Sequence, residues 1–502
     1  MTFLPIVVRE LRVTARRKTT FIVRSVVALL GIGIGASLLF MFGLMGEMVG
    51  RGEMVFMMVS RYTLLIALLA GVFLASDCVS EERREGTLGF LFLTDLKGYD
   101  VVLGKFTAVS LNAFYGLLAV CPVLALSLLA GGVTPGEFWR TCLGLVNTLF
   151  ISVAASLWMS ALSKSSYRAM SAAVCLLVGL TLIGWIAYKL SSLVGRFGAP
   201  LFYVGALSPL TSFSLASDAN YFHQAGEYWI SQAVSNGLGW VFLGLASFRL
   251  RSFTERGVGE TGWRRIFSRR LLAGKTDRRS ELLAMNPVLW LLDDSRRMRA
   301  LPWGIAIVCG AALLIATGFG AFGPVALFLN TYMAWPCYFI LKVFFAIQAC
   351  RFFSEARRTG ALESLSCTPL TTREMVKGQW MALRRVFMWP VIVLMLSQLA
   401  CLCFLGRSVF GMGASAGFMG FYMPLLILKQ IANSIGDFFA VGWFGMWLAL
   451  TLQKPAAAAG LTILYVLVLP AILFCVPTLA TDTVFIVVGC SKIYAKPRCP
   501  LR

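Results

Sequence analysis

Two short stretches of this chain carry charged side chains in the same order, an acid first and a pair of arginines next. The two runs are Glu81, Arg83 and Arg84, and Glu355, Arg357 and Arg358. Both stretches then turn apolar at leucines, which suits a short helix lying along a membrane surface with its charges toward water. Such a helix can bind a soluble partner and pass its movement to the apolar part of the chain. The alternative is an ordinary amphipathic loop helix.

Two ionisable residues lie inside apolar blocks, where a charge is expensive and therefore informative. Asp437 lies in the block that begins near Ile431, and Lys342 lies roughly two turns before the inner end of its own block. Asp437 is suited to lining a polar path or to pairing between helices, and both interpretations stay open. Lys342 can also reach the membrane surface with its long side chain. We take Asp437 and Lys342 as a candidate intramembrane polar site.

Catalytic and metal-binding patterns are not found in the sequence. Gly274-Lys275-Thr276 is a fragment of a phosphate-binding loop, but Arg269 stands where the first glycine should be. His223 is the only histidine, so a histidine-rich metal site cannot form. A serine nucleophile with His223 as its base would lack the usual Gly-x-Ser-x-Gly turn. We expect no catalytic residue, no metal and no cofactor on this chain.

The elements that must position these residues are transmembrane helices. Of the 502 residues, 58% are hydrophobic and 14% are charged, whereas soluble domains have about 45–50% apolar and about 25% charged residues. The mean hydropathy is +0.80. The apolar residues gather in blocks, most of them close to the roughly 20 residues that a membrane-crossing helix needs.

The blocks predict an all-α polytopic membrane protein with about 12 transmembrane helices, 11 of adequate length and a short last one. They are Phe21–Met45, Val55–Ala75, Phe106–Ala130, Phe138–Leu162, Met170–Val194, Trp229–Phe248, Leu301–Ala321, Val325–Cys350, Val386–Leu405, Ile431–Leu452, Gly460–Val476 and Thr483–Cys490. The last block could be a tilted span or an interfacial segment.

The net charge of +22 comes from lysines and arginines that lie between the blocks. Arg249–Arg299 holds 13 of them and Gly195–Tyr228 one, while Arg351–Arg385 holds seven and Gly318–Asn330 none. Basic loops stay in the cytoplasm, so we expect a multi-pass protein of the plasma membrane (the inner membrane of a bacterium) with its N-terminus inside. The lipid bilayer, rather than nucleic acid, is the expected partner of this charge.

The chain also contains an internal repeat. Residues 81–105 and 355–379 are identical at 10 of 25 positions without a gap. Each copy follows the second block of its half and precedes the third. Duplicated units are common in membrane transporters. We therefore predict two tandem six-helix halves, at 1–250 and 301–502, joined by a basic cytoplasmic linker at 251–300.

The repeated segment resembles that of the ABC-2 type of ABC transporter permeases. That family shows an acidic–basic run, Gly-Thr-Leu-Glu, a leucine pair, Thr-Pro-Leu, and Gly-Lys at the start of the third span. The matching residues are Glu81, Gly86, Thr87, Leu88, Leu91, Thr94, Gly104 and Lys105 in the first copy, and Glu355, Gly360, Leu362, Glu363, Leu365, Thr368, Pro369, Leu370 and Gly378 in the second. The departures are Gly89, Asp95, Ala361 and Gln379.

In that family the segment is a coupling helix that docks on a cytoplasmic ATPase. The resemblance implies coupling helices near 81–97 and 355–371. Their ATPase-coupling residues would be Glu81, Arg83, Arg84, Gly86, Thr87 and Leu88, and Glu355, Arg357, Arg358, Gly360, Leu362 and Glu363.

The chain would then be the permease subunit of an ABC-type exporter. ATP and Mg would bind to a separate ATPase subunit, expected as a dimer. Two alternatives remain, an ion-driven secondary carrier that needs carboxylates such as Asp437, and a non-transporting membrane scaffold. The sequence does not indicate the substrate.

Overall fold

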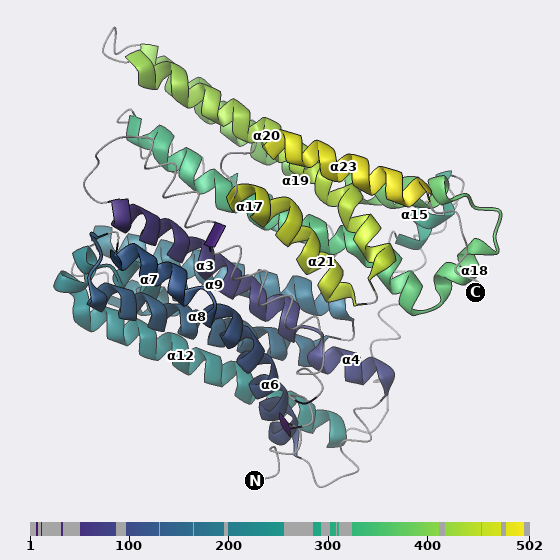
Figure 1. The fold of residues 1–502 in the computed structure, drawn as a ribbon, viewed down its shortest axis with the longest axis horizontal. Helices are drawn as coiled ribbons and strands as arrows, with labels where there is room; N and C mark the ends of the chain where they lie inside the picture. The colour runs from purple at the N-terminus through teal and green to yellow at the C-terminus, as the bar shows by residue number, and fades with distance from the viewer. Residues whose placement is uncertain are drawn as a thin grey trace. The chain divides into compact units, whose positions relative to one another are not determined.

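The structure, a computed structural model, is built from helices. It describes residues 51–86, 97–129, 131–163, 165–194, 199–255, 285–292, 302–307, 324–410, 417–452, 454–472 and 478–495, with a few isolated positions before residue 51 and at 309–310. Every regular element within these ranges is a helix (Figure 1). The all-α prediction is therefore confirmed for the part of the chain that the structure describes.

The chain divides into two compact units, and the first comprises Met1–Gly259 with Ile472–Cys475. The described helices of this unit are α3 (Arg51–Ala75), α4 (Cys78–Glu85), α6 (Gly98–Leu118), α7 (Cys121–Leu129), α8 (Pro135–Leu162), α9 (Ser166–Val194), α10 (Ala199–Ala206), α11 (Pro209–Leu215) and α12 (Asp218–Glu255). The short helix α4 lies at one end of the bundle that the long helices form (Figure 1).

Helix α8 holds the first unit together. It packs most extensively against α12 and α3, and next against α9 and α6. Its start is fixed by Thr134, whose Oγ1 accepts the backbone N–H of Glu137 at 3.1 Å. Small side chains let α3 come close, since the Oγ of Ser152 donates to the carbonyl oxygen of Leu68 at 2.5 Å and Gly71 lies against Ser152.

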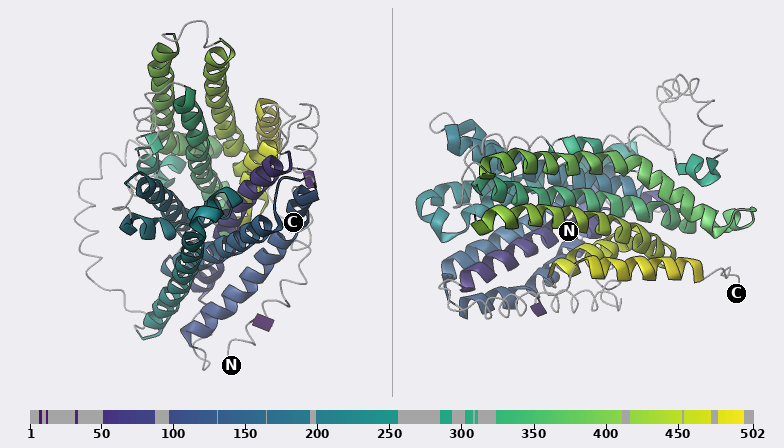
Figure 2. Two further views of the ribbon diagram at one scale, coloured as in Figure 1. Left: turned by 90° about the vertical axis from the view of Figure 1, so that its left-hand side faces the viewer. Right: turned by 90° about the horizontal axis from the view of Figure 1, so that it is seen from above.

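The second unit comprises Glu260–Ala471 and Val476–Arg502. Its described helices are α15 (Pro287–Leu292), α17 (Pro324–Arg358), α18 (Ala361–Ser366), α19 (Thr372–Phe410), α20 (Gly417–Thr451), α21 (Pro455–Ile463), the π-helix η3 (Leu464–Val468), α22 (Leu469–Ile472) and α23 (Thr478–Ala495). The long helices α17, α19 and α20 run side by side (Figure 2).

Helix α20 occupies in the second unit the place that α8 has in the first. It packs most extensively against α23 and α17, and next against α21 and α19. Small residues again allow close approach, because Gly445 lies 3.3 Å from the Sγ of Cys350 on α17, measured from where its Cβ would stand. In each unit, therefore, the third of the described long helices (α8 or α20) packs chiefly against the last (α12 or α23) and the first (α3 or α17).

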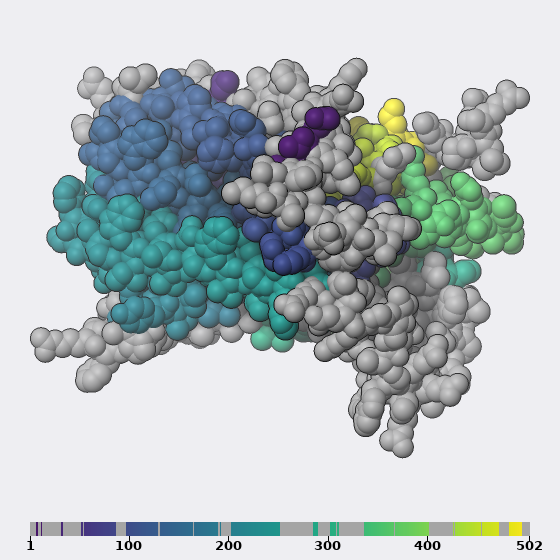
Figure 3. Space-filling model, turned by 90° about the horizontal axis from the view of Figure 1, so that it is seen from below, coloured from purple at the N-terminus to yellow at the C-terminus, as the bar shows by residue number. Residues whose placement is uncertain are grey.

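Seven helical segments in the described residues are long and apolar enough to cross a membrane. They are Val55–Glu85, Gly98–Leu128, Pro135–Leu162, Ser166–Tyr188, Pro336–Arg358, Thr372–Ala400 and Ile427–Thr451. Large apolar side chains are exposed on six of these segments, and on α12, whose surface faces the viewer in Figure 3. Trp240 and Phe248 of α12 are 56% and 72% exposed. This is the architecture of a multi-pass membrane protein.

The seven segments match seven of the predicted blocks, while a total of 12 spans stays a prediction. Gly460–Val476 corresponds to a shorter apolar helix, Pro455–Val468, and Trp229–Phe248 lies within α12. Thr483–Cys490 lies within the 18-residue helix α23, which is not one of the seven segments. Phe21–Met45, and most of both Leu301–Ala321 and the linker 251–300, lie outside the described residues.

The stretch Gly195–Tyr228, whose single basic residue predicts a loop on the outer side, holds two short helices. Helices α10 and α11 pack against α9 and α12. Ser208 begins α11 by accepting the backbone N–H of Leu210 at 3.2 Å, and its Oγ donates to the carbonyl oxygen of Thr181 on α9, also at 3.2 Å. Apolar residues such as Leu215 are buried there, which is why this stretch packs rather than extends.

Candidate functional site

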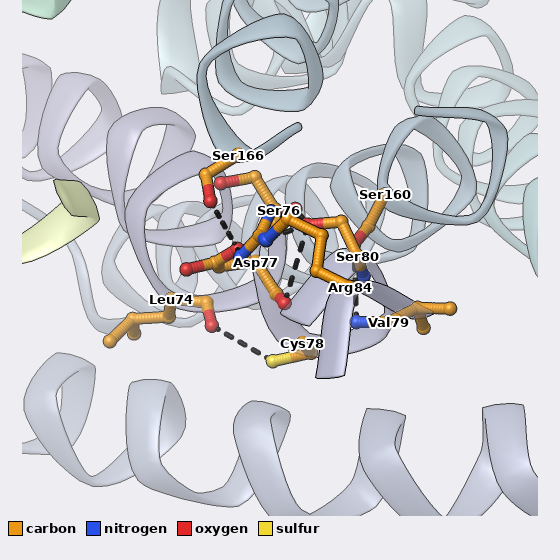
Figure 4. Close-up of polar contacts among 9 residues, drawn as sticks. All are labelled: Leu74, Ser76, Asp77, Cys78, Val79, Ser80, Arg84, Ser160 and Ser166. Carbon is orange, nitrogen blue, oxygen red and sulfur yellow. Dashed lines mark hydrogen bonds and ion pairs between the residues drawn. The ribbon is translucent and has the colours of Figure 1, made fainter. Parts of the chain in front are cut away.

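The charged run of the first copy lies on α4, whose first turn is bonded to the end of α8. A two-residue turn at Ser76–Asp77 separates α4 from α3. The backbone N–H groups of Val79 and Ser80 donate to the Oγ of Ser160, at 3.2 and 3.0 Å. Ser160 thus satisfies two helix-start donors that would otherwise be unpaired, and it fixes α4 to α8 (Figure 4).

Asp77 joins α4 to α9. Its Oδ1 accepts from the Oγ of Ser166 at 2.5 Å, from Nη2 of Arg84 at 2.7 Å and from the Oγ of Ser80 at 3.0 Å (Figure 4). Ser166 is the first residue of α9. The side chains of Arg84 and Asp77 are 15% and 14% exposed, so water screens this ion pair less than one on the surface. Asp77 was not predicted as a site residue because the repeat begins at Glu81.

A second ion pair links α4 to α6. Nζ of Lys105 lies 2.8 Å from Oε1 of Glu82, and both side chains are largely buried. Helix α4 is therefore held by α6, α8 and α9 together. Most of its charged run faces the protein, while Glu85 and Gly86 at its end are exposed.

Gly86 ends α4, and the aligned Gly360 separates α17 from α18. Both glycines have φ +72° and ψ 0°, the left-handed conformation that favours glycine. A Cβ at either position would meet no atom within 4 Å, so the backbone angle and not crowding explains the residue type. Thr87 and Leu88, with the rest of 87–96, lie outside the described residues.

In the second copy the charged run forms the last turn of α17 instead of opening a separate helix. The predicted helix near 355–371 is therefore divided at Gly360, and only Ala361–Ser366 follows as α18. Glu355, Arg358 and Glu363 are exposed, and Leu362 is half-buried. The exposed Arg357 donates from Nη1 to the carbonyl oxygen of Leu450, near the end of α20. The second copy thus presents its charges to the surroundings.

The start of the next long helix is built alike in both units, with positions 274 residues apart. The N–H of Lys97 donates to Oδ2 of Asp100 at 3.1 Å, and the N–H of Thr371 donates to Oε2 of Glu374 at 2.8 Å. An acid three residues inside a helix that accepts from the residue before the helix is one half of a capping box.

The last aligned position, Lys105 in α6 and Gln379 in α19, bonds to a helix that comes earlier in the chain. In the first unit Lys105 pairs with Glu82. In the second unit Nε2 of Gln379 donates to the carbonyl oxygens of Gln348 and Ala349 on α17, at 3.3 and 3.2 Å. The preceding Gly378 lets α15 approach, because a Cβ there would lie 2.6 Å from Oδ1 of Asn286. Each residue therefore bonds to a helix that precedes its own in the chain, Lys105 to α4 and Gln379 to α17.

The two predicted intramembrane residues form an ion pair inside the second unit. Nζ of Lys342 on α17 donates to Oδ2 of Asp437 on α20. Asp482 on α23, which was not predicted as a site residue, interacts electrostatically with both and is 1% exposed. Its signal was an acid directly beside the short block Thr483–Cys490.

The first unit holds an uncharged polar cluster at the interface between α8 and α12. Nδ2 of Asn147 donates to Oε1 of Gln232 at 2.6 Å and to the Oγ of Ser235 at 2.8 Å. Nδ2 of Asn236 donates to Oδ1 of Asn147 at 3.3 Å, and Nε2 of Gln232 to the hydroxyl of Tyr228 at 3.2 Å. The amides satisfy one another, which suits packing of two helices in lipid.

No group of three or more histidine, cysteine, aspartate or glutamate residues that could hold a metal ion occurs in the described ranges.

Neither a protein-family model nor a curated protein sequence matches this chain. The described residues therefore offer two places for function, the α4 and α18 segments at helix ends and the charged cluster of the second unit.

Proposed function

We propose that this chain is the membrane permease subunit of an ABC-type exporter, in which a separate cytoplasmic ATPase acts on the α4 and α18 segments. One observation carries the proposal. Each unit turns at a left-handed glycine beyond its first described long helix, and each ties that turn to the end of its central helix, α4 to Ser160 and Arg357 to Leu450. Force applied at these segments would reach the helices that organise each bundle.

The contacts of α4 favour transmission of movement over a loose loop. Ser160, Ser166 and Lys105 belong to α8, α9 and α6, and all three bond to α4 or to Asp77 at its start. A displacement of α4 must either move these helices or break buried polar contacts, and leaving a buried charge unpaired is expensive. An amphipathic loop helix without a partner needs no such anchorage.

The exposed charges of the second unit suit a soluble partner. Glu355, Arg358 and Glu363 surround Gly360 and are open to solvent, and mixed charges at a rim steer and orient association. We infer that the partner binds to these side chains, and that Arg357 transmits the partner's movement to α20 through its hydrogen bond to Leu450. In the first unit Glu85 and the residues after Gly86 would take that role.

The matched geometry also supports two tandem halves. Residue pairs 274 positions apart share a left-handed glycine (Gly86 and Gly360), a helix-start acid (Asp100 and Glu374) and a backward connection (Lys105 and Gln379). Such agreement is expected of a duplicated unit, as is the shared packing order around α8 and α20.

A second candidate function, an ion-driven carrier, is favoured by the buried Lys342 and Asp482 and the half-buried Asp437, because ionisable residues in spans often mark ion pathways. The energy source separates the two functions. An exporter of the ABC type stops when ATP is withdrawn from sealed vesicles, whereas an ion-driven carrier continues as long as the ion gradient stands.

Purification of the tagged full chain from its own cells tests the proposal. We expect a P-loop ATPase without membrane spans to co-purify in stoichiometric amount and to be lost when Glu355→Lys and Glu363→Lys are combined. The matched control is Glu53→Lys, an exposed acid at the start of α3, the end away from α4. Wild-type protein without such an ATPase, or equal recovery from all three proteins, would contradict the proposal.

A further inference from the structure

The charged cluster of the second unit contains one more acid than its ion pair uses. Lys342 and Asp437 neutralise each other across α17 and α20. Asp482 reaches the same place from α23, where its carboxyl group lies against that of Asp437, and neither of its oxygens accepts from a donor among the described residues. With 1% of the residue exposed, water does not replace the missing partners. One ammonium and two carboxyl groups therefore leave one negative charge to be neutralised.

A buried carboxylate with neither a counter-ion nor donors is among the most unfavourable groups in a protein, and it usually takes up a proton instead. We propose that Asp482, together with the Lys342–Asp437 pair, forms a proton-binding site in the second unit. In the conformation described, Asp482 carries the proton and the cluster is neutral. This inference does not depend on the proposed ATPase partner.

The first unit shows that helix packing alone does not require these charges. At the interface of α8 and α12, which corresponds to that of α20 and α23, an ion pair of Arg140 and Asp218 lies near the start of both helices. At the level of Asn147, the polar groups are the amides and hydroxyl of Asn147, Gln232 and Ser235. Counting back from Lys164 and Lys454, the lysines after each central helix, brings Asn147 and Asp437 to the same place. The second unit thus has ionisable groups where neutral ones suffice.

The cluster lies far from the helix ends that carry α18. Lys342 is 16 residues before the end of α17, Asp437 14 before the end of α20 and Asp482 13 before the end of α23. At about 1.5 Å per residue these are about 20–24 Å along each helix, within a hydrocarbon layer of about 30 Å. Asp482 also lies four residues after the start of α23, and the helices packed around it leave 1% of the residue exposed.

A proton fits the site better than a metal cation. The ammonium of Lys342 already neutralises Asp437, so a metal cation would find one carboxyl group without a counter-ion. Metal ions such as Ca²⁺ need six or more oxygen ligands, and the described residues hold no group of metal-binding side chains.

The other titratable groups around α23 are few. Among the described residues, α20 contributes Asp437 and α17 contributes Lys342 and Tyr338, whose hydroxyl is buried and whose ring lies 6.0 Å from Nζ of Lys342. The π-helix η3 carries only Tyr465. Helix α23 itself adds Cys490 and the exposed Lys492 toward its end.

Release of the proton breaks one O–H bond and changes no other covalent bond. The O–H bond of the Asp482 carboxyl breaks, the proton leaves to water and a carboxylate remains. The ammonium of Lys342 is then shared by two carboxylates, which favours a shift of α23 against α17 and α20. Protonation and helix position are thereby linked.

Infrared spectroscopy of the purified full chain in lipid nanodiscs tests the site, because a protonated carboxyl group has a carbonyl band distinct from that of a carboxylate. We expect such a band at neutral pH, its loss in Asp482→Asn, and its loss in Asp437→Asn, where Lys342 becomes free to pair with Asp482. Asn is the neutral isostere of protonated Asp, so Asp482→Asn should keep the melting temperature of the wild type.

Two results would overturn the proposal. The first is a band that persists in Asp482→Asn, or one that persists in Asp437→Asn if the former variant does not fold. The second is a sodium-dependent rise in melting temperature, measured against choline, that Asp482→Asn abolishes, since the site would then hold a metal cation.

Discussion

Gly86 and Gly360 lie 274 positions apart and adopt the same backbone conformation, φ +72° and ψ 0°. Each ends the helical segment that carries a Glu-x-Arg-Arg run. A side chain in the left-handed region costs roughly 1–2 kcal/mol, and neither site is crowded. The glycines are therefore required by the turn, and the turn is where we place the partner.

Replacing either glycine by alanine should lower stability through the backbone alone. We expect Gly86→Ala and Gly360→Ala to cost about 1–2 kcal/mol each, and Gly360→Asn to cost less because asparagine tolerates this conformation. Chemical unfolding in detergent, followed by circular dichroism, measures the difference. Equal stability of the Ala and Asn variants at 360 would show that the turn does not demand this conformation.

The contacts of Asp77 should behave as one unit. Asp77→Asn or Arg84→Gln leaves a partly buried charge without its partner and should cost about 1.5–3 kcal/mol. The double variant should cost less than the sum, with a coupling energy of about 0.5–3 kcal/mol. Glu85→Gln, at an exposed neighbouring position, is the control and should stay within about 0.5 kcal/mol. Additive losses would mean that the ion pair does not hold α4.

The Lys342–Asp437 pair should respond asymmetrically to the loss of either partner. Removing one member of a buried pair costs about 3–5 kcal/mol. Lys342→Met leaves two carboxyl groups without a cation, whereas in Asp437→Asn the neighbouring Asp482 can accept Lys342. We therefore expect Lys342→Met to be the more destabilising, in unfolding measured at neutral pH. The reverse order would contradict the role assigned to Asp482.

The contact between α3 and α8 depends on a glycine. A Cβ at Gly71 would collide with the backbone of Ser152, so Gly71→Ala should force the helices apart and cost about 1–3 kcal/mol by overpacking. Gly116 on α6 has open space around it, so Gly116→Ala should instead stabilise by up to about 1 kcal/mol. Comparable effects of the two substitutions would argue against this helix packing.

Much of the architecture could be predicted from the sequence because the length of an apolar block is a physical requirement of crossing lipid. The seven spanning segments were found this way. Their ends were less predictable, since α17 continues through Glu355 and Arg358 until Gly360 stops it. A polar composition does not end a helix, whereas a left-handed glycine does.

The candidate sites were predicted in part. Lys342 and Asp437 stood out as charges in apolar blocks, but their pairing joins residues 95 positions apart and depends on how α17 packs on α20. Asn147 and Gln232 carry no charge, so they were not distinguished from the other residues of their spans. Asp77 has no counterpart in the second copy, where Arg351 stands at the aligned position, so the repeat did not reveal it.

Cysteine crosslinking from α18 tests the central claim most directly. Cys367, the residue after α18, is exposed, whereas the other cysteines whose side chains the structure describes are buried or half-buried. A thiol-specific, photoactivated crosslinker on Cys367 in native membranes should give a covalent adduct with a P-loop ATPase. The adduct should be absent in Cys367→Ser, and a cysteine at position 53 in that background should give none. An ATPase adduct from position 53 but not from Cys367, or no ATPase adduct from Cys367, would contradict the claim that this segment is where the ATPase acts.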